Sequence, residues 1–182
     1  MAAADYSSQT FVGHLAALRI TLLICLTVLV IGCGVAACLL PWGTQWLNYP
    51  LSKGIALSGL PEAALQGLVT TRPMGVFSVL IEVCLMGGIF LSLPLQLYIV
   101  GRFVAPALSA REKAFVGPFC LAAFLLFLMG AAIAYFILLP TSLAVAMKLN
   151  RFMGFELIWS ASEYYSLVVW VTLSLGLAFE FP

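Results

Sequence analysis

The stretch ITLLICLTVLVIGCGVAACLL, from Ile20 to Leu40, contains no charged residue and ends directly before Pro41. The hydrocarbon core of a bilayer is about 30 Å thick, and a helix needs about 20 apolar residues to cross it. In lipid, only helices and closed barrels satisfy their backbone polar groups, and this run is too long for a barrel strand. It therefore predicts a transmembrane helix over residues 20–40 that ends at Pro41.

Further apolar runs extend this pattern into a helix bundle. They cover residues 77–100, 114–139 and 162–182, and the last of them is short for a full span. Pro94 interrupts the second run and is expected to kink that helix, and Pro140 directly follows the third, which we expect to end there. We predict an all-α, polytopic membrane helix bundle with four transmembrane helices, forming a single domain over residues 1–182.

The composition supports a lipid-covered surface. Hydrophobic residues make up 64% of the chain and charged residues 8%, whereas soluble domains carry about 25% charged residues. The net charge is +1, and no basic cluster indicates a nucleic-acid partner. The first residues, 1–12, show no cleavable signal pattern.

The sequence offers no catalytic, metal or cofactor site. His14 is the single histidine, so paired axial haem ligands are absent, and no other ligand or nucleophile accompanies it in the sequence. The cysteines all lie in apolar runs without a C-x-x-C pair, which favours a role as small apolar residues: Cys25, Cys33, Cys38, Cys84 and Cys120. We predict a protein that is not an enzyme and needs no cofactor or metal.

Positive charges give a weak indication of orientation. One side of the predicted bundle carries Arg19, Arg102, Arg111 and Lys113, and the other carries Lys53, Arg72, Lys148 and Arg151. The counts are equal, but three of the first set are concentrated in the short loop 101–113. Since cytoplasmic loops are enriched in Lys and Arg, we expect this loop and the N-terminus on the cytoplasmic or matrix side. Aromatic residues would form an interfacial belt on the opposite side: Trp42, Trp46, Trp159, Tyr164 and Tyr165.

Three glutamates are candidates for function. A carboxylate at the centre of a membrane helix costs about 2.5–3.5 kcal/mol on insertion scales, so Glu82 and Glu180 are unusual. Either each reaches an interface, or together they mark a polar cavity inside the bundle. Glu112, between Arg111 and Lys113 in the short loop, is either a solvated charge or a recognition group.

Several fragments in order resemble one family. They are Phe11–Arg19 (FVGHLAALR), Ser92–Pro94 (SLP), Phe103–Leu108 (FVAPAL) with Glu112 and Pro118, Ala134–Phe136 (AYF) with Pro140, and Phe179–Pro182 (FEFP). Across nearly the whole chain, their order and spacing resemble TatC, the multispanning core subunit of the twin-arginine protein translocase.

This resemblance implies a function in protein transport. TatC proteins are receptors for twin-arginine signal peptides, work with small single-span subunits, and are driven by the proton-motive force. The resemblance implies that Glu112, Arg19 and Phe103 bind the signal peptide and that Glu180 faces the concave side of a glove-like bundle. It also implies an energy-transducing membrane, either the bacterial or the mitochondrial inner membrane.

Departures from the family pattern leave alternatives open. Ala17 stands where the family has a second signal-binding glutamate, and Glu82 stands where it often has a basic residue. The family has six membrane helices, whereas only four are expected here, so a second chain with the last two is a candidate partner. One alternative is an accessory structural subunit of a larger membrane complex, such as a respiratory assembly. Another is a small-solute transporter with Glu82 and Glu180 in a proton relay.

Overall fold

The computed structural model describes residues 2–59, 68–70 and 72–180, and most of them are helical. The helices are α1 (Ala2–Leu47), α2 (Tyr49–Ser58), α3 (Gly75–Val104), α4 (Ala110–Lys113), α5 (Val116–Ile133), α6 (Leu139–Phe152) and α7 (Ala161–Ala178). A 3-10 turn, η2 (Ala105–Ala107), follows α3, and a π turn, η3 (Ala134–Leu138), joins α5 to α6. Short strands β1 (Leu68–Val69) and β2 (Trp159–Ser160) pair in parallel. The predicted all-α class is confirmed.

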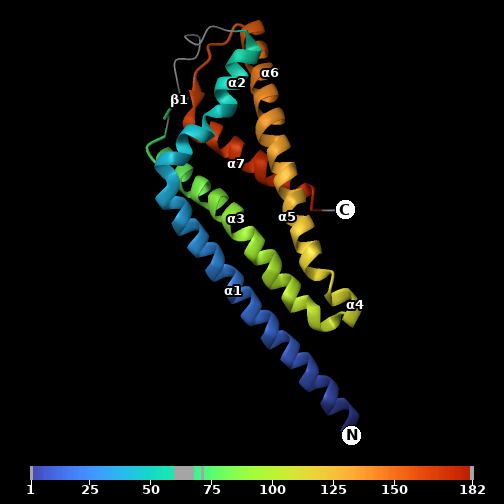
Figure 1. Ribbon diagram of the computed structural model, residues 1–182. Helices are drawn as coiled ribbons and strands as arrows, with labels where there is room; N and C mark the ends of the chain where they lie inside the picture. Colours follow the sequence, from blue (N-terminus) through green and yellow to red (C-terminus); the bar gives the residue numbers. More distant parts are fainter. Residues whose placement is uncertain (1, 60–67, 71, 181–182) are drawn as a thin grey trace.

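Two long arms set the shape of the molecule (Figure 1). The first arm is the pair α1 and α3, which run side by side in opposite directions, and the second is the continuous rod α5–η3–α6. The arms meet near α4, which we call the α4 end, and diverge toward the opposite end, which we call the cap. In the cap, α2 packs on α6, and α7 lies between the arms in contact with both α3 and α5.

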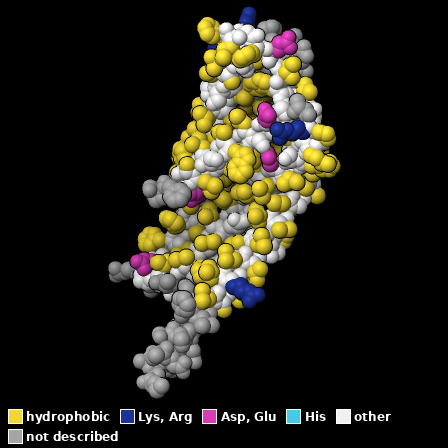
Figure 2. Space-filling model, turned by 180° about the vertical axis from the view of Figure 1, so that it is seen from behind, with side chains coloured by type: hydrophobic (Ala, Val, Ile, Leu, Met, Phe, Trp, Pro, Cys, Tyr) yellow, Lys and Arg dark blue, Asp and Glu magenta, His cyan; other side chains and the backbone are white. Residues whose placement is uncertain are grey.

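Three helical segments in the described part of the chain are long and apolar enough to cross a bilayer: Leu15–Pro41, Gly75–Val104 and Val116–Phe152. They overlap the first three predicted spans, but the third continues to Phe152 and so passes its predicted end at residue 139. The 18-residue helix α7 lies at the place of the short fourth span. Figure 2 shows hydrophobic side chains along most of the visible face, with few charged groups among them. An exposed apolar surface of this extent is what a bundle surrounded by lipid requires.

Pro41 and Pro140 do not end their helices, and both predicted boundaries are wrong. Pro41 lies inside α1, which continues to Leu47, and Pro140 lies in the first turn of α6. The rod passes Pro140 because the π turn η3 precedes it and the first turn of a helix needs no proline N–H. The hydroxyls of Thr141 and Ser142 also donate to the Leu138 carbonyl at 2.9 and 2.7 Å. These are local bonds from threonine and serine hydroxyls to a carbonyl three or four residues earlier in the helix.

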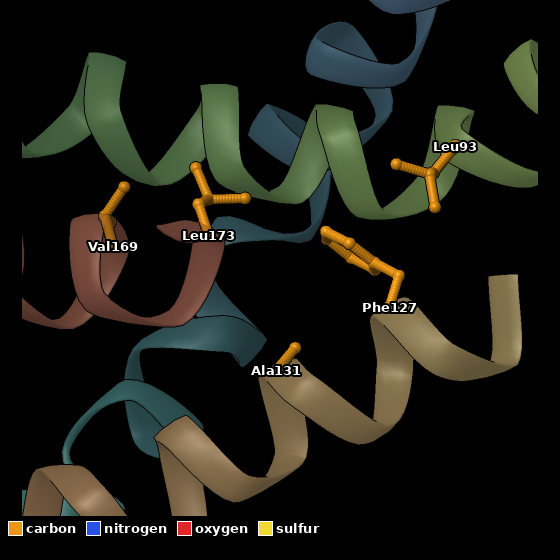
Figure 3. Packing of buried hydrophobic residues seen from close by; sticks show 5 residues of the cluster. All are labelled: Leu93, Phe127, Ala131, Val169 and Leu173. Atoms are coloured by element: carbon orange, nitrogen blue, oxygen red, sulfur yellow. The ribbon is translucent and has the colours of Figure 1, made fainter. Parts of the chain in front are cut away.

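The main core lies where α3, α5 and α7 meet. Figure 3 shows five of its side chains converging from these helices: Leu93, Phe127, Ala131, Val169 and Leu173. Phe127 is fully buried and packs edge-on against Phe90 with ring centroids 5.1 Å apart. A Cβ on Gly176 would lie 2.7 Å from the Phe127 ring, so this glycine allows α7 to approach α5. The residues that fix α7 between the two arms are thus apolar and closely packed.

Small residues bring α1 and α3 into direct backbone contact. A Cβ added to Gly88 would lie 2.8 Å from the Cys33 backbone nitrogen, and one added to Gly32 would lie 2.8 Å from the Gly88 carbonyl oxygen. A Cβ on Gly87 would lie 2.8 Å from the Ala36 Cβ. In lipid, close helix contacts depend on such residues.

Tyrosine hydroxyls fix the end of α1 to the rest of the cap. The last carbonyls of a helix have no partner within the helix. Here Tyr135 donates to the Trp46 carbonyl, and Tyr164 donates to the Leu47 carbonyl at 2.7 Å. Tyr165 donates to the Asn48 side-chain oxygen at 3.0 Å. Tyr164 is buried, so it holds the bundle together and does not form the lipid-facing belt that we expected of it.

Candidate functional site

Glu112 lies at the α4 end in a local structure that its own segment creates. Ser109 is the N-cap of α4, and the two residues form a capping box in which each side chain faces the backbone N–H of the other. The Ser109 N–H donates to Glu112 Oε2 at 2.7 Å. Hydrogen bonds from the Ser109 hydroxyl and backbone N–H lower the pKa of the fully exposed Glu112 carboxyl. The carboxylate is therefore ionised, exposed and held in one orientation.

An apolar groove runs between α3 and α5 and opens beside Glu112. The groove has a volume of ≈330 Å³, and Glu112 is the one charged residue among its described lining residues. Its apolar wall includes Val104, Leu108, Phe115 and Phe119, and the two phenylalanines are 69% and 74% exposed. A carboxylate at the mouth of an apolar groove suits a ligand that joins a cationic group to an apolar segment.

Gly101 is one of the residues that line this groove. A Cβ on Gly101 would lie 2.9 Å from Val116 Cγ1 and 2.8 Å from Cys120 Sγ, so the glycine lets α3 and α5 touch. The Cys120 thiol also donates to the Leu97 carbonyl at 3.3 Å. These contacts fix the position of α5 relative to α3 directly behind Glu112.

Arg19 lies at the same level of the bundle as this groove. Gly32 and Gly88 touch across the antiparallel pair α1 and α3. At 1.5 Å per residue, Arg19 lies about 20 Å from that contact along α1, and Gly101 lies about 20 Å from it along α3 in the same direction. In the described part of the chain, no hydrogen bond or ion pair joins Arg19 to Glu112. Arg19 is exposed, as is Ala17 beside it.

The other predicted signal-binding residue, Phe103, lies on α3 and is half-buried. It is not part of the described lining of the groove. The structure therefore brings Glu112 to the groove and leaves Arg19 and Phe103 outside it. Phe181 and Pro182 lie outside the described residues, as do the side chains of His14, Trp42 and Arg111.

Glu82 lies inside the bundle and is paired. It is half-buried on α3, and the Ser166 hydroxyl of α7 donates to its Oε2 at 2.5 Å. This bond links α3 to α7 away from the α4 end. Glu82 is thus part of a polar contact between two helices, which favours the interior position over one at the interface.

Glu180 follows the end of α7 and is half-buried. Its Oε1 is buried without a hydrogen-bond partner among the described residues. It lies on a second apolar hollow of ≈450 Å³ along α5, which shares Phe119 and Ala123 with the groove at Glu112. The two hollows are therefore adjacent along α5, and a carboxylate lines each of them.

Glu82 and Glu180 are not neighbours. Ser166, the partner of Glu82, is separated from Glu180 by nearly the whole of α7, a rise of about 20 Å. A proton relay through the pair has no support in this arrangement. No group of three or more His, Cys, Asp or Glu residues that could hold a metal ion occurs among the described residues.

Ser109 and Ser166 were missed by the analysis of the sequence. The segment Ser109-Ala110-Arg111-Glu112 fits the S-x-x-E pattern of a capping box, so the role of Ser109 could have been predicted from this spacing alone. The pairing of Ser166 with Glu82 joins residues that are 84 positions apart, and no local pattern predicts such a contact.

The comparison with protein families gives one match. Residues 13–182 fit the model of TatC, the Sec-independent protein translocase protein. A TatC protein of Aquifex aeolicus is 34% identical over 174 residues, which cover 93% of this chain and 68% of the relative. TatC of Escherichia coli K12 is 30% identical over 176 residues, which cover 96% of this chain and 65% of that relative. A third TatC protein, from Koribacter versatilis, is covered to 62%, so the chain spans about two thirds of the length of these relatives.

A solved structure has the same fold. The crystal structure of a twin-arginine translocase receptor TatC in the detergent DDM superimposes with a TM-score of 0.78 at 32% sequence identity. The similar region covers 93% of this chain and 72% of that one. None of these relatives is described as a respiratory subunit or a solute transporter.

Proposed function

The chain belongs to the TatC family of Sec-independent protein translocases, and from this premise we propose that it is a membrane receptor for twin-arginine signal peptides. The observation that carries the proposal is the ionised Glu112 carboxylate at the mouth of an apolar groove between α3 and α5. A twin-arginine signal has the matching chemistry, because a cationic pair precedes an apolar segment. A relative with a solved structure is itself described as a receptor.

Glu112 is the group that we assign to the arginines. A guanidinium donates two parallel hydrogen bonds to a carboxylate, which lysine does less well. The lowered pKa keeps Glu112 charged at neutral pH, and its full exposure leaves it open to a ligand. Because Ala17 offers no charge, we assign one arginine to Glu112 and none to position 17.

The apolar segment of the signal fits the surface along α5. The groove at Glu112 and the hollow at Glu180 share Phe119 and Ala123 as lining residues, and we assign the apolar segment to the surface across both. An apolar helix lying on this surface would bury the exposed rings of Phe115 and Phe119, a recurring mode of peptide recognition. In this proposal Glu180 lies near the far end of the bound segment.

The proposed setting follows from the same assignment. Signal peptides reach the translocase from the side on which precursors are made, so the α4 end and the N-terminus face the cytoplasm or matrix. The partners are then precursor proteins and small single-span translocase subunits in an energy-transducing membrane, and the proton-motive force drives transport.

Precursor binding by charge-reversed protein tests this function. The full chain is reconstituted in lipid nanodiscs and mixed with a folded precursor that carries a twin-arginine signal. Glu112→Lys should abolish binding, because the carboxylate is replaced by a cation that repels arginine. Glu156→Lys makes the same charge change at an exposed position near the cap and should bind like the parent protein. Undiminished binding by Glu112→Lys would mean that the signal is recognised elsewhere.

A further inference from the structure

We propose that Ser109 is a positioning residue for signal recognition, holding the Glu112 carboxylate toward the groove so that an arginine meets a fixed acceptor. The inference rests on the proposed function and adds a residue that acts through Glu112. It starts from the capping box, in which the Ser109 N–H donates to Glu112 Oε2 at 2.7 Å. A carboxylate has about four acceptor sites, so this bond leaves room for a guanidinium.

Orientation matters because Glu112 is otherwise unsupported. It is fully exposed, and a free glutamate side chain would adopt several rotamers that binding must then restrict. The other residues that line the groove mouth are apolar and provide no hydrogen bond from a side chain: Val104, Leu108, Phe115 and Val116. Ser109 thus orders Glu112 before the ligand arrives in two ways: its backbone N–H donates to the carboxylate, and its side-chain oxygen accepts from the Glu112 backbone N–H.

Cations that could compete for Glu112 lie toward the same end of the bundle. Lys113 is adjacent, and Arg111 precedes Glu112 with its side chain outside the described part. Arg19 on α1 and Arg102 on α3 are the other described cations toward this end. Within the described residues, none of Arg19, Arg102 and Lys113 forms an ion pair with Glu112. A carboxylate released from Ser109 would be free to pair with them and would be less available to a signal arginine.

The capping box has a structural role as well, since it caps the four-residue helix α4. The two roles differ in what they predict. A loss of helix capping weakens binding whether or not residue 112 is charged. A loss of positioning weakens binding only when the Glu112 carboxylate is present, and it also changes the pH at which that carboxylate titrates.

The test is a double-mutant cycle in nanodiscs with a fluorescent synthetic twin-arginine signal peptide. The variants are Ser109→Ala, Ser109→Thr, Glu112→Gln and the Ser109→Ala/Glu112→Gln pair, with Ser174→Ala as an exposed serine control. Alanine keeps the backbone N–H that donates to Glu112 Oε2 but removes the side-chain half of the capping box, which loosens the reciprocal pair. We expect Ser109→Ala to bind about three- to tenfold more weakly, the effect of freezing one flexible side chain. Ser109→Thr should bind like the parent, because threonine keeps the hydroxyl. In the Glu112→Gln background, Ser109→Ala should have no further effect.

A pH series gives a second readout that helix capping alone would not move. Removing the Ser109 hydroxyl takes away a hydrogen bond that lowers the pKa of Glu112, so the acid midpoint of peptide binding should rise in Ser109→Ala. Equal weakening by Ser109→Ala in both backgrounds, or an unchanged midpoint, would overturn the positioning role while leaving the proposed function intact. If the parent protein itself does not bind the peptide, the proposed function fails first.

Discussion

Gly88→Ala tests the contact on which the first arm depends. The added Cβ would lie 2.4 Å from Cys33 Sγ, 2.8 Å from the Cys33 nitrogen and 3.0 Å from its Cα. The thiol can rotate, but the backbone atoms belong to α1, so the two helices must separate. Overpacking of this kind costs about 1–3 kcal/mol, whereas Gly to Ala inside a helix gains about 1 kcal/mol in propensity. We expect Gly88→Ala to lower the free energy of unfolding by up to about 2 kcal/mol.

Gly34→Ala is the matched control. Gly34 lies on α1 two residues from Gly32, and a Cβ there would meet nothing within 4 Å. This variant keeps the propensity gain without the clash, so the two variants should differ by the steric cost of about 1–3 kcal/mol. Adding Cys33→Ala to Gly88→Ala should restore part of the stability, because it removes Sγ and leaves the backbone contact.

The assay is equilibrium unfolding in mixed micelles of mild detergent and sodium dodecyl sulfate, followed by tryptophan fluorescence. The comparison of the two glycine variants under identical conditions removes effects of the detergent. If Gly88→Ala unfolds at the same denaturant fraction as Gly34→Ala, then α1 and α3 do not touch as described and the helix-contact argument fails.

Three further predictions concern other parts of the molecule. Tyr164→Phe should lower the free energy of unfolding by about 0.6–1.7 kcal/mol in the same assay, because it removes the hydrogen bond to the Leu47 carbonyl. Tyr98→Phe, at a 55% exposed position, should leave the free energy of unfolding unchanged. Phe127→Ala empties a fully buried site and should lower the free energy of unfolding by about 3–5 kcal/mol. Phe119→Ala, at a 74% exposed position in the groove, should leave stability unchanged but weaken signal-peptide binding. The reverse pattern would contradict the assigned core and groove. Signal-peptide affinity should persist to a lower pH than an ordinary glutamate would allow, because hydrogen bonds from Ser109 lower the pKa of Glu112. In a pH titration of binding, a midpoint above the usual range of a glutamate would contradict this assignment.

The apolar runs predicted the membrane-spanning helices because lipid constrains length and polarity so strongly. The ends of these helices were harder to predict. We expected both Pro41 and Pro140 to end a helix. At Pro140 the preceding π turn η3 and the first-turn position of the proline let the helical rod continue, and Pro41 lies inside α1. Hydropathy carries no information about such compensation.

The candidate site was predictable only in part. The resemblance identified Glu112, and the S-x-x-E spacing could have identified Ser109. The groove itself depends on how closely α3 approaches α5 at Gly101, which no single segment determines. The bond between Glu82 and Ser166 likewise depends on where α7 crosses α3. Local signals predict caps and spans, whereas contacts between distant helices require the packed structure.

The most direct test of the central claim is the discrimination between a twin-arginine signal peptide and the same peptide with two lysines. The parent protein in nanodiscs should prefer arginine, because the guanidinium matches the Glu112 carboxylate in two hydrogen bonds. Glu112→Gln should bind the arginine peptide about 10- to 100-fold more weakly, as expected for the loss of a charge-assisted bond, and should lose most of the preference. If Glu112→Gln keeps the full preference for arginine over lysine, Glu112 does not read the signal and the proposed recognition site is wrong.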